Sequence, residues 1–172
     1  MPPPARRTAA RWCESVVSVS LRPATDDDRP GICTVHVRAI RETCARSYSP
    51  EQVSAWAGLL SPDSYSTVLK ERILVVATDG GVIVGFGQLN PDTGEVDAVY
   101  VLPDRQGEGI GRLLLAELEA QARVRDIRML ELSATLNAVP FYAQAGYTRC
   151  HVAVHRLPTG VELQCVRMGK EL

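Results

Sequence analysis

The sequence predicts a single α/β domain in which helices flank a mixed, mostly antiparallel sheet of about seven strands. Three observations support this fold class. The chain has 172 residues, which is the length of one domain. Short segments rich in apolar and β-branched residues alternate with segments of helical periodicity. Hydrophobic residues make up 45% of the chain and charged residues 23%, as in an ordinary folded protein.

The first part of the domain is predicted to be one strand followed by helices. Apolar and hydroxyl residues alternate over 16–22, which predicts a half-buried strand. Thr25 is an expected N-cap before three aspartates, and apolar residues at helical spacing predict a helix that runs to about Cys44. Ser49–Pro50 and Ser61–Pro62 each predict the start of another short helix, because proline is favoured at the first helical position.

The second part is predicted to be an antiparallel meander followed by alternating helices and strands. Glycine-containing turns separate the three strands of the meander. An amphipathic helix then follows a glycine-rich segment and ends near Arg125. The expected elements are strands over 73–77, 82–89 and 95–101, the amphipathic helix, a strand over 129–133, a helix over 139–144, and closing strands over 147–156 and 161–168.

Charge and cysteine content argue against several classes of protein. With 19 Lys and Arg against 20 Asp and Glu, the formal net charge is −1, so no nucleic-acid partner is expected. No apolar run approaches the roughly 18 residues that span a bilayer, so no membrane partner is expected. The five cysteines are odd in number and scattered, which favours a reducing, cytoplasmic location and no metal site. Residues 1–14, rich in Pro and Arg, are expected to form a disordered leader before a domain over 15–172.

The glycine-rich segment Gln106–Gly111 lies between a predicted strand and a predicted helix. Unpaired N–H groups at a helix start, with glycines that allow positive φ, make it a candidate diphosphate cradle. Arg105 and Arg112 could add positive charge at its rim. A dinucleotide fingerprint would need a glycine where Arg112 stands, and a P-loop would need a lysine that the segment lacks. A tight turn without a ligand is the alternative.

Two motifs resemble those of the GNAT N-acetyltransferase superfamily. Residues 106–111 read Gln-x-x-Gly-x-Gly, similar to the family's Gln/Arg-x-x-Gly-x-Gly/Ala segment. Residues 141–147 read Phe-Tyr-x-x-x-Gly-Tyr, which resembles the family's later helix and its glycine end. The resemblance implies the GNAT fold, acetyl-coenzyme A as co-substrate, and transfer of the acyl group to a primary amine by direct attack in a ternary complex. It implies no metal.

By this resemblance, two backbone segments and one asparagine would hold the cofactor. The strand before the loop would lie along the pantetheine arm, and the loop N–H groups would bind the pyrophosphate. Asn137 stands five residues before Tyr142, whereas the family's asparagine is often seven before, so Asn137 either contacts pantetheine or caps the helix. The expected cofactor-binding residues are Val99, Tyr100, Val101, Gln106, Gly107, Glu108, Gly109, Ile110, Gly111, Arg112 and Asn137.

Candidate catalytic residues follow from the chemistry of amine acylation. An amine with a pKa near 10.4 is almost wholly protonated at pH 7, so a base or a water chain must remove its proton. Glu95 and Asp97 share one face of a strand, and the resemblance implies a base on that strand. His36 is a third candidate base. The resemblance assigns Tyr142 the role of the acid that protonates the thiolate leaving group.

The alternative function is a coenzyme A-binding domain with a regulatory or interaction role and no turnover. Glu95, Asp97 and Tyr142 favour an enzyme, because a binding module needs neither acids nor a phenol around a thioester. Residues 48–56, together with His36, resemble an uncharacterised bacterial branch of N-acyltransferases, which leaves open whether the acceptor is a small molecule or a peptide. Relatives are often dimers, and the closing strands offer an edge for a homodimer.

Overall fold

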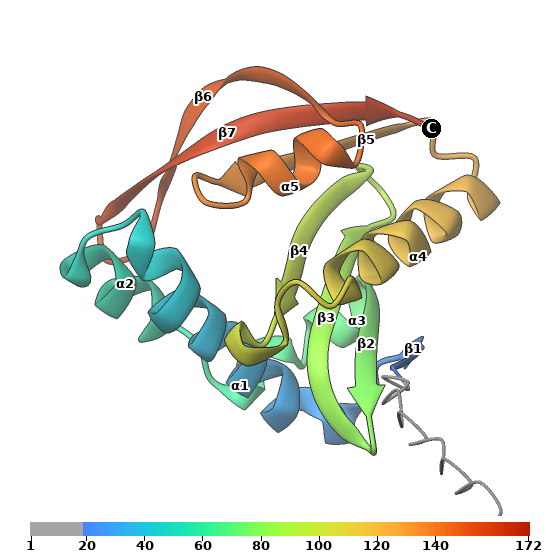
Figure 1. Cartoon of the computed structure of the whole chain (residues 1–172), viewed down its shortest axis with the longest axis horizontal. Coiled ribbons are helices and arrows are strands. Elements are labelled where there is room, and N and C mark those ends of the chain that lie inside the picture. Colours follow the sequence, from blue (N-terminus) through green and yellow to red (C-terminus); the bar gives the residue numbers. More distant parts are fainter. Residues whose placement is uncertain (1–18) are drawn as a thin grey trace, which may run out of the picture.

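The structure, a computed structural model that describes residues 19–172, confirms the predicted α/β fold class (Figure 1). The strands are β1 (Ser20–Pro23), β2 (Ile73–Asp79), β3 (Val82–Asn90), β4 (Glu95–Val101), β5 (Met129–Thr135), β6 (Thr148–Arg156) and β7 (Glu162–Glu171). The helical elements are η1 (Asp26–Asp28), α1 (Arg29–Arg38), η2 (Ala39–Thr43), η3 (Cys44–Arg46), α2 (Pro50–Ala57), η4 (Pro62–Tyr65), α3 (Val68–Glu71), η5 (Pro103–Arg105), α4 (Ile110–Val124) and α5 (Val139–Gln144).

The seven strands form one mixed sheet in the order β1-β2-β3-β4-β5-β7-β6. Every neighbouring pair is antiparallel except β4 and β5, which are parallel. The last strand of the chain, β7, lies between β5 and β6, so β6 is an edge strand. The proposed homodimer edge therefore exists as a strand edge, and the dimer itself stays a prediction.

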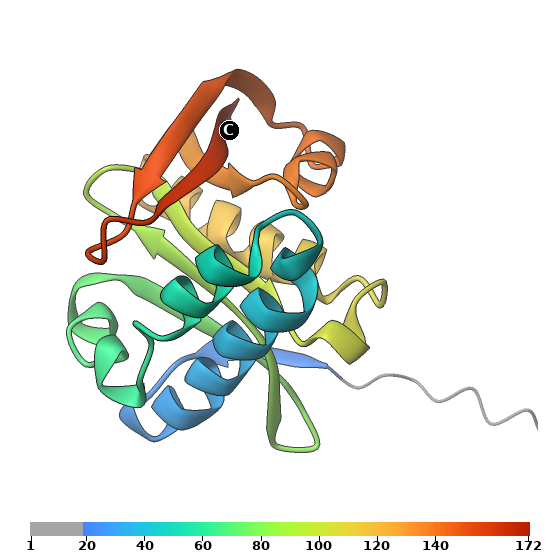
Figure 2. The same cartoon turned by 90° about the vertical axis from the view of Figure 1, so that its left-hand side faces the viewer.

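Helices cover both faces of the sheet, because successive apolar side chains of the central strands point to opposite faces and both faces must be buried. Val75 and Ala77 of β2 pack with the apolar stripe of α4 and with α5. Leu74 and Val76, which alternate with them, pack with Ile32 of α1 and other residues on the opposite face. Figure 2 looks onto this second face, with α1 and α2 in front of the strands. We call it the α1 face.

The feature that positions the site is the short pairing of β4 with β5. Only Glu95–Glu131 and Val96–Leu132 are register partners, although both strands continue beyond them. Beyond these pairs the two strands diverge, as Figure 1 shows. Within the part of the chain that the structure describes, the backbone groups of 99–101 that point toward β5 therefore have no sheet partner. We call this opening between the strands the fork.

The first helix differs from its prediction in the second half. It begins as expected, with a capping box in which Thr25 and Asp28 bond each other's backbone N–H groups. The α-helix ends at Arg38, however, and the chain continues through the π-helical turn η2 and the 3-10 turn η3. Periodicity cannot anticipate a π turn, because the one extra residue leaves the apolar spacing on either side intact. The predicted strand over 16–22 lies partly outside the described residues, and the predicted leader over 1–14 lies wholly outside them.

The turn that leads into β4 depends on Gly94, which has φ +74°. A Cβ on Gly94 would lie 2.6 Å from the carbonyl oxygen of Met129, whereas one on Gly81, at φ +83°, would meet no atom within 4 Å. Gly94→Ala is therefore expected to lower the free energy of unfolding by roughly 2–4 kcal/mol. Gly81→Ala should cost only about 1 kcal/mol, the strain of a left-handed alanine. Urea unfolding measures both, and equal losses would contradict the proposed clash.

Candidate active site

A cavity of about 580 Å³ opens at the fork. Its walls come from β4, from the glycine-rich loop and the start of α4, from the segment between β5 and α5, and from η2 and η3. Of the eleven residues predicted to bind the cofactor, ten line this cavity, and Glu108 does not. The structure thus gathers the backbone segments that the motifs pointed to around one opening.

The glycine loop presents an open cradle of backbone N–H groups. Gly107 and Gly109 have φ of +85° and +83°, and a Cβ on either would meet no atom within 4 Å. Gly109 is the N-cap of α4, and the first N–H groups of a helix have no partner within it. The positive end of the helix dipole lies at the same place. This arrangement suits a diphosphate, which supplies several anionic oxygens at once.

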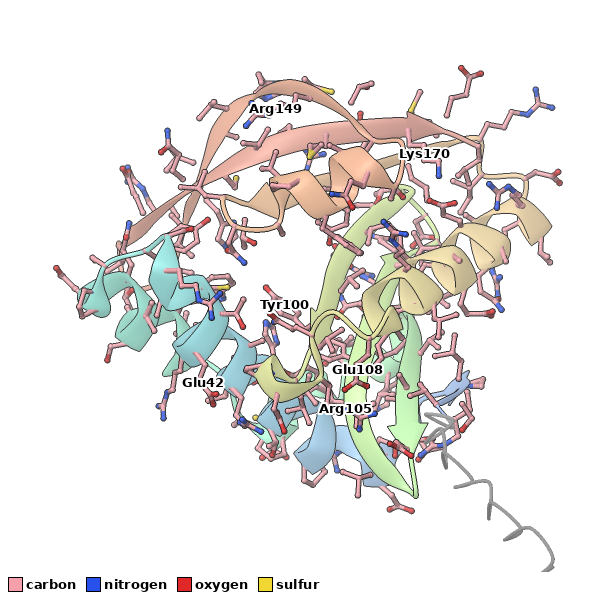
Figure 3. All side chains as sticks on the ribbon, in the orientation of Figure 1. Glu42, Tyr100, Arg105, Glu108, Arg149 and Lys170 are labelled. Atoms are coloured by element: carbon pink, nitrogen blue, oxygen red, sulfur yellow. The ribbon has the colours of Figure 1, made fainter. Side chains whose placement is uncertain are left out.

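The two arginines at the rim of the loop differ in their partners. Arg105 binds Glu108 through its Nε at 2.9 Å and Asp79 through its Nη2 at 3.0 Å, so two carboxylates neutralise it. Figure 3 shows Arg105 and Glu108 side by side, which explains why Glu108 does not line the cavity. Arg112 instead donates to the neutral side chain of Gln144 at 3.0 Å. Among the described residues, Arg112 is therefore the rim cation that keeps its charge available to a ligand.

Asn137 has a buried side-chain oxygen, Oδ1, with no hydrogen-bond partner in the described part of the chain. It lines the cavity, and the residue that caps α5 is Ala138. Of the two roles left open for Asn137, the helix cap therefore falls to its neighbour. A buried acceptor without a partner is unfavourable unless a ligand donates to it. The amide N–H groups of a pantetheine arm are donors of the required kind, so the residues present fit coenzyme A.

Glu95 lies at the base of the fork on the α1 face, in a cluster of charges. Its carboxylate receives a hydrogen bond from Nη1 of Arg167 at 2.5 Å. The same guanidinium donates to Glu131 at 3.0 Å and to Ser133 at 2.9 Å. Because Glu95 and Glu131 are directly opposite each other across β4 and β5, their charges would repel without Arg167 between them. Arg167 thus fixes the position of the Glu95 carboxylate.

Asp97 lies on the same face, at an irregularity in the pairing of β3 with β4. It accepts a hydrogen bond from Gln88 at 2.8 Å and lies 3.3 Å from Nε of Arg72. Burial raises the pKa of this carboxyl above its usual value, and the charge of Glu95 adds to the rise against the opposing effects of Gln88 and Arg72. A carboxylate with a raised pKa is a stronger base than an ordinary aspartate. Neither acid lines the cavity itself, so both lie beside it on the α1 face.

Two tyrosines lie on opposite faces of the sheet at the fork, and of the two only Tyr100 lines the cavity. Tyr142 is buried on α5, with its ring against Phe141 and Tyr147, and burial raises the pKa of its phenol. Tyr100 was expected to act through its backbone, but its side chain lines the cavity from the α1 face (Figure 3). Burial raises the pKa of Tyr100 well above its usual value, and the Tyr142 phenol adds to that rise. Both phenols therefore stay protonated at neutral pH.

His36 lies in an aromatic cluster beneath Tyr100. Its ring centroid is 4.2 Å from that of Tyr100, and its Nδ1 is 2.9 Å from the Tyr65 hydroxyl. Desolvation lowers the pKa of this imidazole to about 3, so it is neutral near pH 7. A base should have a pKa close to the working pH, which argues against His36 in that role.

Three cavity residues, Ala39, Thr43 and Cys44, had no signal in the sequence motifs. They come from η2 and η3, about 60 residues before the loop they face. Cys44 is buried, and desolvation raises the pKa of its thiol to about 11, so it is not a thiolate nucleophile at neutral pH. This segment reaches the site because of the π turn at η2, which the sequence motifs do not indicate. Such π turns are frequent at functional sites.

Within residues 19–172, no group of three or more His, Cys, Asp and Glu side chains is placed to hold a metal ion. None of the helices described has the length and apolar character needed to cross a membrane.

Comparisons with known proteins agree with this geometry. The family model described as an acetyltransferase (GNAT) domain matches residues 44–171. A GCN5-related N-acetyltransferase from Rhodopseudomonas palustris has a crystal structure that is similar with a TM-score of 0.84 and 31% identity, over 89% of this chain and 95% of that one. The uncharacterized N-acetyltransferase YafP of Escherichia coli K12 is 25% identical over 130 residues, which are 76% of this chain and 81% of YafP. The PaiA N-acetyltransferase from Thermoplasma acidophilum, solved in complex with coenzyme A, is 19% identical over 90% of this chain and 99% of that one, with a TM-score of 0.72.

The neutral His36 predicts how stability depends on pH. The unfolded chain binds a proton at this imidazole near pH 6.5, whereas the folded chain binds it only near pH 3. Stability is therefore fully present above pH 6.5 and is lost progressively as the pH falls toward 3. His36→Phe keeps a ring in the cluster and removes the titration, so the variant should lose less stability than the wild type between pH 7 and pH 5. Urea unfolding at both pH values measures this, and an identical loss in both proteins would show that His36 is not the group responsible.

Proposed function

This chain belongs to the GNAT acetyltransferase superfamily and is an N-acetyltransferase, and we propose that it acylates a primary amine by direct attack within a ternary complex with acetyl-coenzyme A. The observation that carries the proposal is the cavity at the fork, which joins an open cradle of N–H groups to the unpaired acceptor of Asn137. The bound thioester supplies an activated acetyl group. The roles of the residues follow from where they lie around that cavity.

We assign three parts of the chain to holding the co-substrate. The N–H groups of the glycine loop and the start of α4 bind the diphosphate, with the free charge of Arg112 beside them. Residues 99–101 present unpaired backbone groups at the edge of β4, which bond the peptide-like arm as another strand would. One N–H of this segment also polarises the carbonyl to be attacked, as an oxyanion donor does. Asn137 accepts from an amide of the arm on the opposite side of the cavity.

Asp97 is the base that we propose for the amine, with Glu95 as its charged neighbour. Asp97 lies two residues before the strand edge that lines the cavity, and its carboxyl has a raised pKa. Glu95 instead forms an ion pair with Arg167, which occupies its carboxylate. Together with Glu131, these acids outnumber their partners Arg72 and Arg167, and the resulting negative charge on the α1 face favours the approach of an ammonium group.

Tyr142 is the acid that we propose for the leaving thiolate. Its phenol is buried near the fork, with a pKa raised by desolvation. A phenol in this environment stays protonated, so it is available to donate a hydrogen bond, and then its proton, as negative charge develops on the sulfur. Tyr142 approaches from α5, whereas Asp97 lies on the α1 face, so the proposed acid and base lie on opposite sides of the fork.

The alternative is a coenzyme A-binding domain that does not turn over, and its site would need the cradle but not the acids.

The four cysteines that the structure describes are free thiols, which supports the proposed cytoplasmic location. The proposed acceptor is an amine of a small molecule or peptide.

The experiment that tests the proposal is thermal unfolding with acetyl-coenzyme A, coenzyme A or an adenine nucleotide. At about 100 times Kd a ligand stabilises the folded state by roughly 2.7 kcal/mol, which raises Tm by several degrees in a domain of this size. Gly109→Trp should abolish the shift, because it fills the cradle, while Gly160→Trp, at the similar φ of +85° in an open turn, should keep it. No shift in folded wild-type protein would contradict the proposal. A shift without thiol release from acetyl-coenzyme A across a panel of amines would favour the alternative.

The proposed base and acid predict a bell-shaped dependence of kcat/KM on pH. The acid limb should lie above pH 3.8, because activity needs the ionised form of a carboxyl whose pKa is raised. Asp97→Asn should lower kcat by about 10² to 10⁴ and remove this limb, and Tyr142→Phe should lower kcat by at least about tenfold with KM unchanged. Tyr147→Phe is the matched control, because it removes a buried hydroxyl that has no hydrogen-bond partner within residues 19–172.

The assignment of the base is decided by a second variant. If Glu95→Gln removes the acid limb and Asp97→Asn keeps it, the two carboxylates exchange roles. If Tyr142→Phe retains wild-type kcat, Tyr142 is not the acid.

A further inference from the structure

One hydrogen bond joins the glycine loop to a helical segment far away in the sequence. Nε2 of Gln106 donates to Oγ1 of Thr43 at 2.8 Å, across 63 positions of the chain. Gln106 is the residue directly before Gly107, at which the backbone turns into the positive-φ conformation of the cradle. Thr43 is the last residue of the π turn η2. The bond therefore connects the entrance of the cradle to the end of the α1 segment.

A second polar contact runs parallel to the first. Nη1 of Arg38 lies 3.2 Å from Asp104 of η5, and Nε of the same side chain donates to Glu42 at 2.8 Å. Figures 1 and 2 both show η5 against the C-terminal part of the α1 segment, and Figure 3 labels Glu42 there. This pair is exposed and contributes little by itself. The hydrogen bond between Thr43 and Gln106 is exposed as well, but it ends on the glycine loop itself.

The π turn explains why Thr43 reaches the loop. An α-helix turns about 100° per residue, and a π turn inserts one residue into that repeat. Residues after the insertion are rotated by about 100° relative to a continuous helix, so Thr43 would not face the loop without it. Ala39 and Cys44, at the two ends of the same turn, line the cavity together with Thr43. The local distortion thus directs a small polar side chain at the cofactor loop.

The loop needs such a contact because of its composition. Its three glycines give the free loop more accessible conformations than other residues would, and ordering them on binding lowers affinity. A side-chain bond at the entrance removes part of that freedom before the ligand arrives and leaves the backbone N–H groups unused. The α1 segment also covers the face on which Glu95 and Asp97 lie. The α1 segment therefore contacts both the glycine loop and the face that bears Glu95 and Asp97, so a change in the order of one affects the other.

We infer that Thr43 is a positioning residue for the diphosphate loop: its hydroxyl holds Gln106, and through it the cradle, in the form that binds acetyl-coenzyme A. The inference rests on the proposed function, since it takes the loop as the site of the diphosphate. Thr43 acts through Gln106, so the two side chains form one unit. Binding of acetyl-coenzyme A correspondingly orders the η2–η3 segment through the same bond.

Isothermal titration with acetyl-coenzyme A tests this in the full chain. Thr43→Val keeps the shape of the side chain and removes the hydroxyl, so Kd should rise about fivefold, the usual effect of one neutral hydrogen bond. Thr43→Ser should stay within about twofold of the wild type, because the hydroxyl is restored. The matched control is Thr34→Val on α1, where the hydroxyl bonds only the Pro30 carbonyl of its own helix, and its Kd should not change.

A double-mutant cycle separates positioning from direct contact with the ligand. Gln106→Met should also raise Kd about fivefold, and the pair Thr43→Val with Gln106→Met should raise it no further, because each change breaks the same bond. A double variant with the product of both effects, about 25-fold, would overturn the inference, since Thr43 would then act on the ligand itself. A wild-type Kd in Thr43→Val would overturn it too.

Hydrogen exchange gives a readout that a merely structural role would not change. In the wild type, saturating acetyl-coenzyme A should slow exchange of amides in residues 39–46, and Thr43→Val should lose most of that protection while keeping it in the loop. Equal protection in both proteins would contradict the proposed link. If the wild type itself binds no acetyl-coenzyme A, the proposed function fails first, which distinguishes the two failures.

Discussion

The structure of this site depends on the early separation of β4 from β5. Two register pairs hold the strands together, and beyond them the backbone of 99–101 is not paired with β5. Unpaired backbone groups in a protein interior are costly, so they need another partner, which a peptide-like ligand can be. The opposite arm of the fork is stabilised internally: the hydroxyl of Tyr48 accepts from the N–H of Leu136 and donates to the carbonyl of Gln164. One arm is thus satisfied by the chain, and the other is left for the co-substrate.

Charge at the base of the fork follows from the same geometry. The first register pair of β4 and β5 places Glu95 opposite Glu131, an unfavourable arrangement unless a cation separates them. Arg167 supplies that cation only because β7 lies beside β5 rather than at the edge of the sheet. The position of β7 therefore fixes the acid cluster, and a chain with the last two strands exchanged would leave both glutamates without this partner.

Local sequence patterns predicted the helices and strands well, but they did not predict contacts between residues far apart in the sequence. Ser49 and Pro50 identified α2 because a capping box and a proline at the first turn act within four residues. The glycines of the loop were recognisable because positive φ is a property of single residues. Nothing local, in contrast, shows that Thr43 meets Gln106 or that Glu108 turns away to Arg105. Those outcomes depend on a π turn and on side chains brought together by the tertiary fold.

The distribution of charge around the fork separates the two proton transfers. His36 and the phenols of Tyr100 and Tyr142 are neutral at pH 7, because burial opposes their charged forms. The carboxylates beside the fork, Glu95 and Asp97, lie on the α1 face with their arginine partners. In the proposed mechanism, a proton taken from an ammonium group moves to a carboxylate on that face, and a proton given to a thiolate comes from a neutral phenol on the other side. The carboxylate loses its charge when it gains a proton, whereas donation leaves Tyr142 as a buried phenolate that must regain a proton before the next cycle. Because the two groups lie on opposite sides of the fork, neither transfer places a like charge beside the other.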